Sequence, residues 1–170
     1  SWAFRKAPGF FDVVTYTGNG TAGRTVAHNL GSAPGMILIK NLEHEDDWRV
    51  YHRSLGATKR LIINSTATAT TNSAEFNDTE PTSSVFTLGS SNNVNGNNSP
   101  FVAYIFAHDD QSFGTNSDES IIKCGTYEGT GGTQEIDLGF EPQWLMLKNV
   151  DAVSNWIMVD ISLSIYCFSN

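Results

Sequence analysis

Short runs of apolar residues, separated by polar segments, extend along the whole chain. Residues 35–41 contain four consecutive apolar side chains, and residues 48–52 alternate, with Trp48, Val50 and His52 on one face. Runs of this length bounded by Gly, Pro and Asn are typical of β-strands, and the continuous run fits a strand covered on both faces. The pattern predicts strands within residues 10–18, 24–31, 35–41, 48–52, 59–64, 83–89, 100–107, 119–129, 133–139, 142–149 and 155–164.

The connecting segments 65–82, 90–99 and 108–118 are rich in Asn, Asp, Gly, Ser and Thr, which favour turns. No long segment carries the apolar stripe of an amphipathic helix. About ten short strands with such connectors predict an all-β fold, an antiparallel β-sandwich of jelly-roll-like or lectin-like type.

One phrase occurs twice, at residues 28–48 and at residues 136–156. Six positions match: Leu30, Gly31, Pro34, Lys40, Asn41 and Trp48 recur as Leu138, Gly139, Pro142, Lys148, Asn149 and Trp156, each 108 positions later. Gly permits a bend and Pro restricts the residue before it to an extended shape, so the phrase predicts a corner followed by a buried strand. Two copies of one supersecondary unit are the simplest explanation.

The second copy is incomplete, because the chain ends 14 residues after Trp156. We therefore divide the chain into an N-terminal connector (1–11), a first β-sandwich unit (12–110), a linker loop (111–120) and a second, partial β unit (121–170). A partial unit leaves an apolar sheet face uncovered, and we expect a neighbouring copy of the chain or a downstream segment to cover it.

Charge and composition exclude some partners. The formal net charge is −8, and the largest basic groupings are Arg5-Lys6 and Lys59-Arg60. Nucleic-acid binding needs a basic patch, so no nucleic-acid partner is expected. No run approaches the roughly 20 apolar residues of a membrane span, so no membrane insertion is expected either. Cys124 and Cys167 are interpreted as two separate thiols at strand positions.

The repeated aromatic and basic residues have two possible roles each. Trp48 and Trp156 each open a strand in phase with apolar positions, which favours packing, but an exposed ring would instead stack on a sugar. Lys40 and Lys148 each end an apolar run. Their stems are expected to lie on apolar surface with the ammonium groups in water.

Two polar segments are candidate sites. Loop 90–99 contains Asn93, Asn95 and Asn97, whose amides suit a surface ligand if the loop is displayed on a rigid scaffold. Residues 108–119 contain Asp109, Asp110 and Asp118, hard oxygen ligands of the kind that Ca²⁺ uses, although not at the spacing of a calcium loop. No other cofactor is expected.

No sequence motif marks an enzyme. The chain has no nucleophile elbow and no phosphate-binding loop. A glycan-degrading enzyme would need two carboxylates facing each other across a cleft, and a stand-alone carbohydrate-binding domain would need an exposed Trp48 or Trp156. Both remain alternatives to a non-enzymatic role.

An ordered set of phrases resembles a known protein family. The phrases are "YTGNGTAGRTVAHNLGSAPGMILIKN", "DDWRVYHRSLGATKRLIIN", "FNDTEPTSSVFTLGSSNNVN" and "FVAYIFAHDDQSFG", followed by "GTYEGTG" and "GFEPQWLMLKN". In this order they resemble tail-fibre-like proteins of tailed bacteriophages, over roughly Phe10 to Asp160. The resemblance implies a structural or adhesive component of the virion tail, with other copies of itself, other tail proteins and a host-surface glycan as partners. It supplies no catalytic residue.

Overall fold

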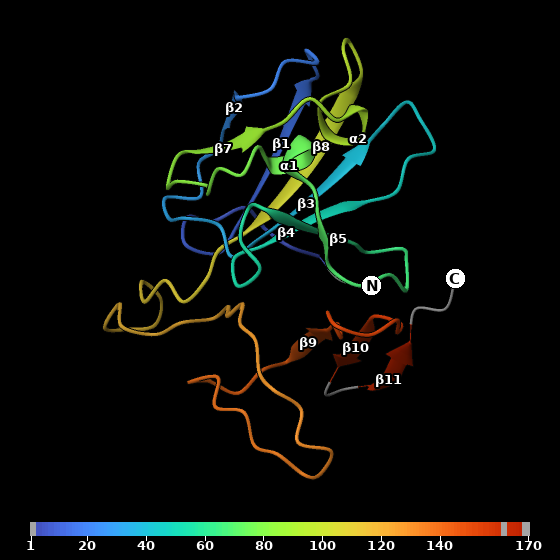
Figure 1. The fold of residues 1–170 in the computed structure, drawn as a ribbon. Coiled ribbons are helices and arrows are strands. Elements are labelled where there is room, and N and C mark those ends of the chain that lie inside the picture. The colour runs from blue at the N-terminus through green and yellow to red at the C-terminus, as the bar shows by residue number, and fades with distance from the viewer. Residues whose placement is uncertain (1–2, 161–162, 168–170) are drawn as a thin grey trace.

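The computed structural model describes residues 3–160 and 163–167. Its main element is a six-stranded antiparallel sheet in the order β1-β8-β3-β4-β5-β6 (Figure 1). These strands are β1 (Phe11–Thr17), β3 (Met36–Asn41), β4 (Arg49–His52), β5 (Lys59–Ile62), β6 (Thr70–Thr71) and β8 (Pro100–Phe106). The predicted all-β antiparallel, sandwich-like fold is therefore confirmed.

One face of this sheet, here called the inner face, carries the larger core. Alternate residues Ile37 and Ile39 of β3 and Ile105 of β8 point to it and are fully buried. A two-stranded ribbon of β2 (Arg24–Ala27) and β7 (Val85–Leu88) and two one-turn helices, α1 (Ser73–Phe76) and α2 (Asn92–Asn95), supply the opposing apolar side chains. These opposing side chains are Val26, Phe76, Phe86, Leu88 and Val94.

The opposite, outer face of the sheet is apolar as well. Met36 and Leu38 of β3 alternate with the inner-face residues, and Val50, Leu61 and Phe106 extend the same cluster. The uninterrupted apolar run of β3 is thus explained by contacts on both faces, as predicted.

The second copy folds as a three-stranded sheet, β11-β10-β9, below the first unit in Figure 1. Its strands are β9 (Trp144–Leu147), β10 (Ile157–Asp160) and β11 (Leu163–Cys167). Hairpin β3–β4 pairs Met36 with His52, and hairpin β9–β10 pairs Trp144 with Asp160. Both pairs are related by the repeat offset of 108, so the repeated phrase encodes one hairpin in one register twice.

The hairpin loops also share their internal bonds. The Oδ1 atom of Asn41 accepts hydrogen bonds from the backbone N–H groups of the residues two and three positions later in the chain. The Oδ1 atom of Asn149 accepts the two equivalent bonds. The ammonium group of Lys40 donates to the Asp46 carbonyl at 2.6 Å, and that of Lys148 to the Ser154 carbonyl at 2.9 Å. Each ammonium group therefore closes its own loop from a partly exposed position, a role that the expectation of lysine heads in water did not include.

Predicted strands at 119–129 and 133–139 are wrong, since these segments carry no strand. Their counterparts in the first unit are β1 and β2, which pair with β8 and β7 respectively. No strand that the structure describes pairs with either of the later segments. Unpaired backbone gains nothing from a strand conformation.

Segments expected to be turns contain short regular elements. The connector 65–82 holds β6 and α1, and loop 90–99 holds α2, which the Ser91 side chain caps. Among the described residues, no helix has both the length and the apolar character that a bilayer crossing requires. Cys124 is a free thiol outside any strand, and burial raises its pKa to about 12. The thiol of Cys167 lies outside the described side chains.

A buried histidine makes the first unit sensitive to acid. His28 is 5% exposed; its Nδ1 accepts from the Leu30 N–H, and its Nε2 lies 3.2 Å from the Thr82 carbonyl. Burial lowers the pKa of His28, and burial also lowers the pKa of His52. The folded chain therefore binds fewer protons than the unfolded chain at pH values just below the ordinary histidine pKa of about 6.5.

We expect the free energy of unfolding to fall as pH decreases from about 6.5, and to be unaffected by these groups at higher pH. Urea titrations between pH 8 and pH 5 measure this slope. His28→Asn keeps an acceptor near Nδ1 without the titration and should reduce the slope. An identical slope in His28→Asn and wild type would contradict this assignment.

Candidate functional site

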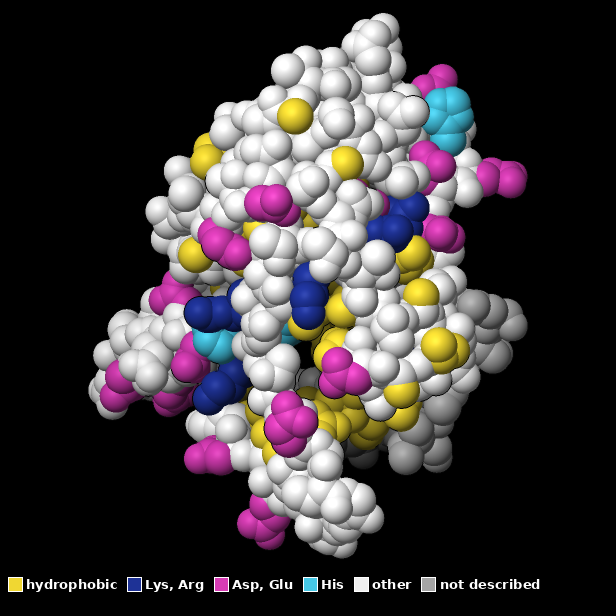
Figure 2. Space-filling view, in the orientation of Figure 1, with side chains coloured by type: hydrophobic (Ala, Val, Ile, Leu, Met, Phe, Trp, Pro, Cys, Tyr) yellow, Lys and Arg dark blue, Asp and Glu magenta, His cyan; other side chains and the backbone are white. Residues whose placement is uncertain are grey.

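The outer face of the six-stranded sheet carries an apolar groove of about 450 Å³, here called the outer groove. It is lined by Phe4, Phe11, Val13, Leu38, Trp48, Ile63, Tyr104 and Phe106. Figure 2, which views the molecule from the side of α1 and α2, shows acidic side chains scattered over the surface. All eight lining side chains are uncharged, and seven of them carry no polar side-chain oxygen.

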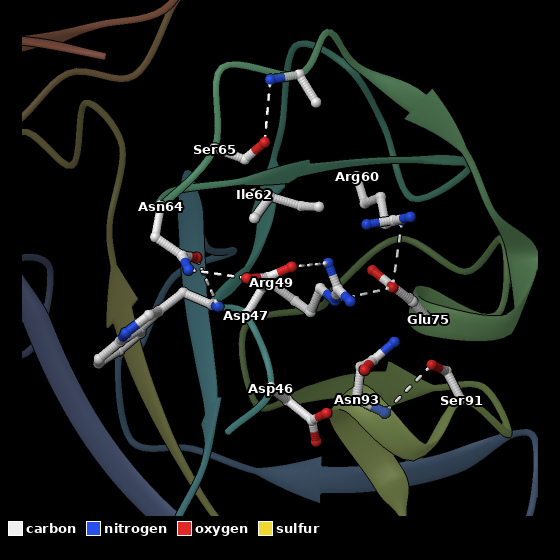
Figure 3. A network of polar contacts seen from close by, with 12 residues as sticks. Asp46, Asp47, Arg49, Arg60, Ile62, Asn64, Ser65, Glu75, Ser91 and Asn93 are labelled. Carbon is white, nitrogen blue, oxygen red and sulfur yellow. Dashed lines mark hydrogen bonds and ion pairs between the residues drawn. The ribbon is translucent and has the colours of Figure 1, made fainter. Parts of the chain in front are cut away.

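The Trp48 ring forms one wall of the outer groove. It stacks on Tyr104 with ring centroids 5.8 Å apart and planes 17° from parallel, and it is half-buried. Its backbone is held by Asn64, whose Oδ1 accepts from the Trp48 N–H at 3.1 Å while its Nδ2 donates to Asp47. Figure 3 shows Asn64 directed at Asp47. Trp48 therefore remains a candidate for contact with a partner.

Trp156, in the equivalent position of the second copy, is a packing residue. It is 5% exposed, lies in the outer-face cluster, and donates from Nε1 to the Ile62 carbonyl at 2.9 Å. The alternative of a sugar-stacking Trp156 is wrong, because its ring is inside the protein.

Further contacts place the second copy on the first. The Lys148 ammonium group and the Ser154 N–H both donate to the Thr66 carbonyl, and the Ala69 N–H donates to the Val150 carbonyl. Met146 and Val150 pack against the outer-face cluster beside Trp156. The partial unit thus covers part of the apolar face of its own chain, and the outer groove is the part left open.

The three candidate asparagines have different environments. Asn95 is fully buried; its Nδ2 donates to the Thr21 and Gly89 carbonyls, and its Oδ1 accepts from Asn19 N–H and the Arg24 guanidinium. A ligand role for Asn95 is wrong, because its amide holds α2 to the turn after β1.

Asn93 is half-buried, and its side chain lies close enough to Glu75 to act against the rise in the pKa of that carboxyl group. Only Asn97 is exposed among the three. Loop 90–99 therefore offers a solvent-facing amide at Asn97, at the end of the first unit where Figure 1 shows α2.

The three candidate aspartates do not all lie at one place in the structure. Asp109 and Asp118 line a polar cavity of about 310 Å³ together with Glu119 and Lys123. Asp110 does not line it, and its carboxylate lies beside Gly9. Within residues 3–160 and 163–167, no three His, Cys, Asp or Glu side chains form a group that could hold a metal ion. Ca²⁺ binding at these aspartates stays a prediction.

A buried ionic cluster was not found from the sequence. The carboxylate of Glu75 in α1 is fully buried, and its Oε1 lies 3.2 Å from Arg49 Nε and 3.3 Å from Arg60 Nε (Figure 3). Burial raises the pKa of Glu75, while the two guanidinium groups act in the opposite direction. The alternation of β4 indicates only that Arg49 shares a face with Tyr51, and nothing in the segment 73–76 signals a buried acid.

These contacts make the cluster structural. It joins β4 and β5 to α1 on the inner face of the sheet. The side-chain Nδ2 of Asn72, the residue that caps α1, lies 3.5 Å from the same Glu75 oxygen. The side chains of Arg49 and Glu75 are 8% and 0% exposed, so a solvent-borne ligand does not reach this pair.

Comparison with known proteins gives one match. No curated protein and no solved structure matches the chain. One family model covers residues 5–169 and so spans both copies of the hairpin. The chain belongs to the family described as Domain of unknown function (DUF7483).

Proposed function

We propose that this domain is a non-enzymatic structural and adhesive module of a bacteriophage tail fibre, acting in the virion tail outside the host cell. The observation that carries the proposal is the docking of the repeated hairpin onto the first unit, through Trp156 and the contacts around Thr66. A unit that packs against its own repeat forms a stiff body that further copies can extend. The order of phrases shared with tail-fibre-like proteins supports the same role.

The adhesive part of the proposal is placed at one end of the first unit. Asn97 and the neighbouring Asn98 are exposed at the tip beside α2, whereas segment 109–119 lies toward the second unit in Figure 1. Because these two segments lie at different ends, they do not form one surface. The Asn97 tip is therefore the better candidate for contact with the hydroxyl groups of a host-surface glycan.

The proposal predicts where the protein is found. Antibodies raised against the purified domain should label the tails of phage particles from a lysate that carries the gene, as seen by immunogold electron microscopy. Pre-immune serum is the control, and gold on capsids or on no particle would contradict the proposal.

A glycan-degrading enzyme is the second candidate, favoured by the carboxylates of Asp109, Asp118 and Glu119 around the polar cavity. Carboxylate pairs across a cleft are what glycoside hydrolysis requires. Release of reducing ends from host polysaccharide by the purified chain, abolished in Glu119→Gln, would replace the proposed passive role with this one.

A further inference from the structure

The outer groove is an uncovered continuation of an interface that exists inside the chain. Its lining residues Leu38, Tyr104 and Phe106 belong to the same apolar cluster as Trp156 and Met146 of the second copy. One part of this face is therefore closed by protein, while the adjoining part is open. Five of the eight lining side chains are aromatic and none is charged.

The closed part shows what kind of surface this face accepts. Met146 is the repeat counterpart of Leu38, and Trp156 is the counterpart of Trp48. Met146 and Trp156 lie in one apolar cluster with Leu38 and Val50, so the corresponding face of the second hairpin is turned toward the outer face of the first unit. The hydrogen bonds of this interface run to Ile62, Thr66 and Ala69, on and after β5.

In the first hairpin, the residues equivalent to those that pack in the second hairpin are more exposed. Val150 packs against the outer-face cluster, but its counterpart Leu42 is 57% exposed. Trp156 is 5% exposed, but Trp48 is only half-buried at the edge of the groove. The first unit therefore presents the same apolar surface that its repeat buries.

We propose that the outer groove packs against the outer groove of a second copy of this chain, in a two-fold symmetric dimer. This inference rests on the proposed function, because it names the partner through which the tail module assembles. In a two-fold interface the same patch serves both copies, and the outer groove continues the apolar face on which the second copy of the phrase already packs. Trp48 and Tyr104 form the aromatic centre of such an interface, where packing energy is concentrated.

The charge of the chain sets the salt dependence of this dimer. Each copy carries a formal net charge of −8, so two copies repel each other at long range. The groove lining contains no charged side chain, so its apolar contacts do not depend on charge. Added salt therefore screens the repulsion between the two acidic copies without weakening the attraction between the grooves. Dimerisation should become tighter as ionic strength rises from about 0.02 M to about 0.3 M.

Sedimentation velocity between about 1 and 100 µM tests the proposal, with 18.6 kDa as the monomer mass. We expect a concentration-dependent shift to twice this mass. Val13→Glu places a charge in the groove and should weaken dimerisation at least about tenfold. Val153→Glu is the matched control, because Val153 is 75% exposed and does not line the groove, and it should leave dimerisation unchanged.

A second measurement does not depend on variants folding. Hydroxyl-radical footprinting of the wild type should show oxidation of Trp48 and Tyr104 falling as concentration rises, with Tyr127, which is 52% exposed, unaffected. A monomer at all concentrations, a dimer that protects neither Trp48 nor Tyr104, or a groove filled by a glycan on a monomer would each overturn the proposal. Gold-labelled tails together with a monomeric chain would remove this dimer and leave the proposed function standing.

Discussion

Glu75→Gln is expected to lower the free energy of unfolding by roughly 3–5 kcal/mol, the usual cost of removing one partner from a buried ion pair. Glu75 is fully buried, and its carboxylate is the shared partner of Arg49 and Arg60. The amide keeps the shape of the side chain but removes the buried counter-charge of both guanidinium groups, and Arg49 keeps only its longer ion pair with the more exposed Asp47 at 3.8 Å. Urea or guanidinium denaturation followed by circular dichroism measures the loss.

A charge-free replacement separates the ionic effect from packing. In Arg49→Met/Arg60→Met/Glu75→Leu, the three charges are removed together, and stability should return close to that of wild type, because buried ion pairs are often no better than apolar residues of similar size. Glu43→Gln, on the exposed hairpin loop, should change stability by no more than about 0.5 kcal/mol. A fully stable Glu75→Gln single variant would show that the cluster does not hold α1 to the sheet.

Trp156→Ala is expected to release the second unit from the first. The ring is 5% exposed and its Nε1 donates to the Ile62 carbonyl, so truncation leaves a cavity at the junction of the two units. Removing a buried Trp typically costs about 3–5 kcal/mol. We expect faster hydrogen exchange at the β9 and β10 amides, while β3 and β8 stay protected.

Two further variants define the contribution of the ring. Trp156→Phe retains an aromatic side chain but loses the hydrogen bond, which contributes on the order of 1 kcal/mol. Val153→Ala, at a position 75% exposed, should leave the exchange of β9 and β10 unchanged. Unaltered exchange in Trp156→Ala would mean that the backbone contacts at Thr66 and Ala69 suffice to hold the unit.

The strands of the first unit were predictable because their signals are local. The continuous apolar runs of β3 and β8 match burial on both faces of the sheet. The alternation of β4 predicted which residues share a face, but Arg49, Val50 and Tyr51 are all buried because both faces of this strand are covered. The repeat also predicted the β9–β10 hairpin, since identical corner and loop residues produce the same register. The roles of Lys40 and Asn41 inside the loop were not predicted, because their acceptors and donors lie on residues whose positions only the folded turn defines.

The candidate sites were less accessible to prediction. An Asn-rich loop suggested three displayed amides, but Asn95 is buried against Arg24, Asn93 is half-buried close to Glu75, and only Asn97 is exposed. Glu75 meets its arginine partners across separate elements, a contact that no local pattern encodes. The outer groove likewise requires residues from six segments to lie together.

The sequence by itself determined an antiparallel all-β fold that contains one hairpin twice. Side-chain periodicity and the Gly and Pro corner residues direct the backbone over only a few neighbouring positions, so these features can be read locally. Only the tertiary structure decided that Trp156 is buried while Trp48 lines an open groove, although both occupy the same place in the phrase. It also decided that 119–129 and 133–139 are not strands. The physical reason is the same in both cases: burial and strand pairing depend on a partner surface, and the two copies of the phrase find different partners.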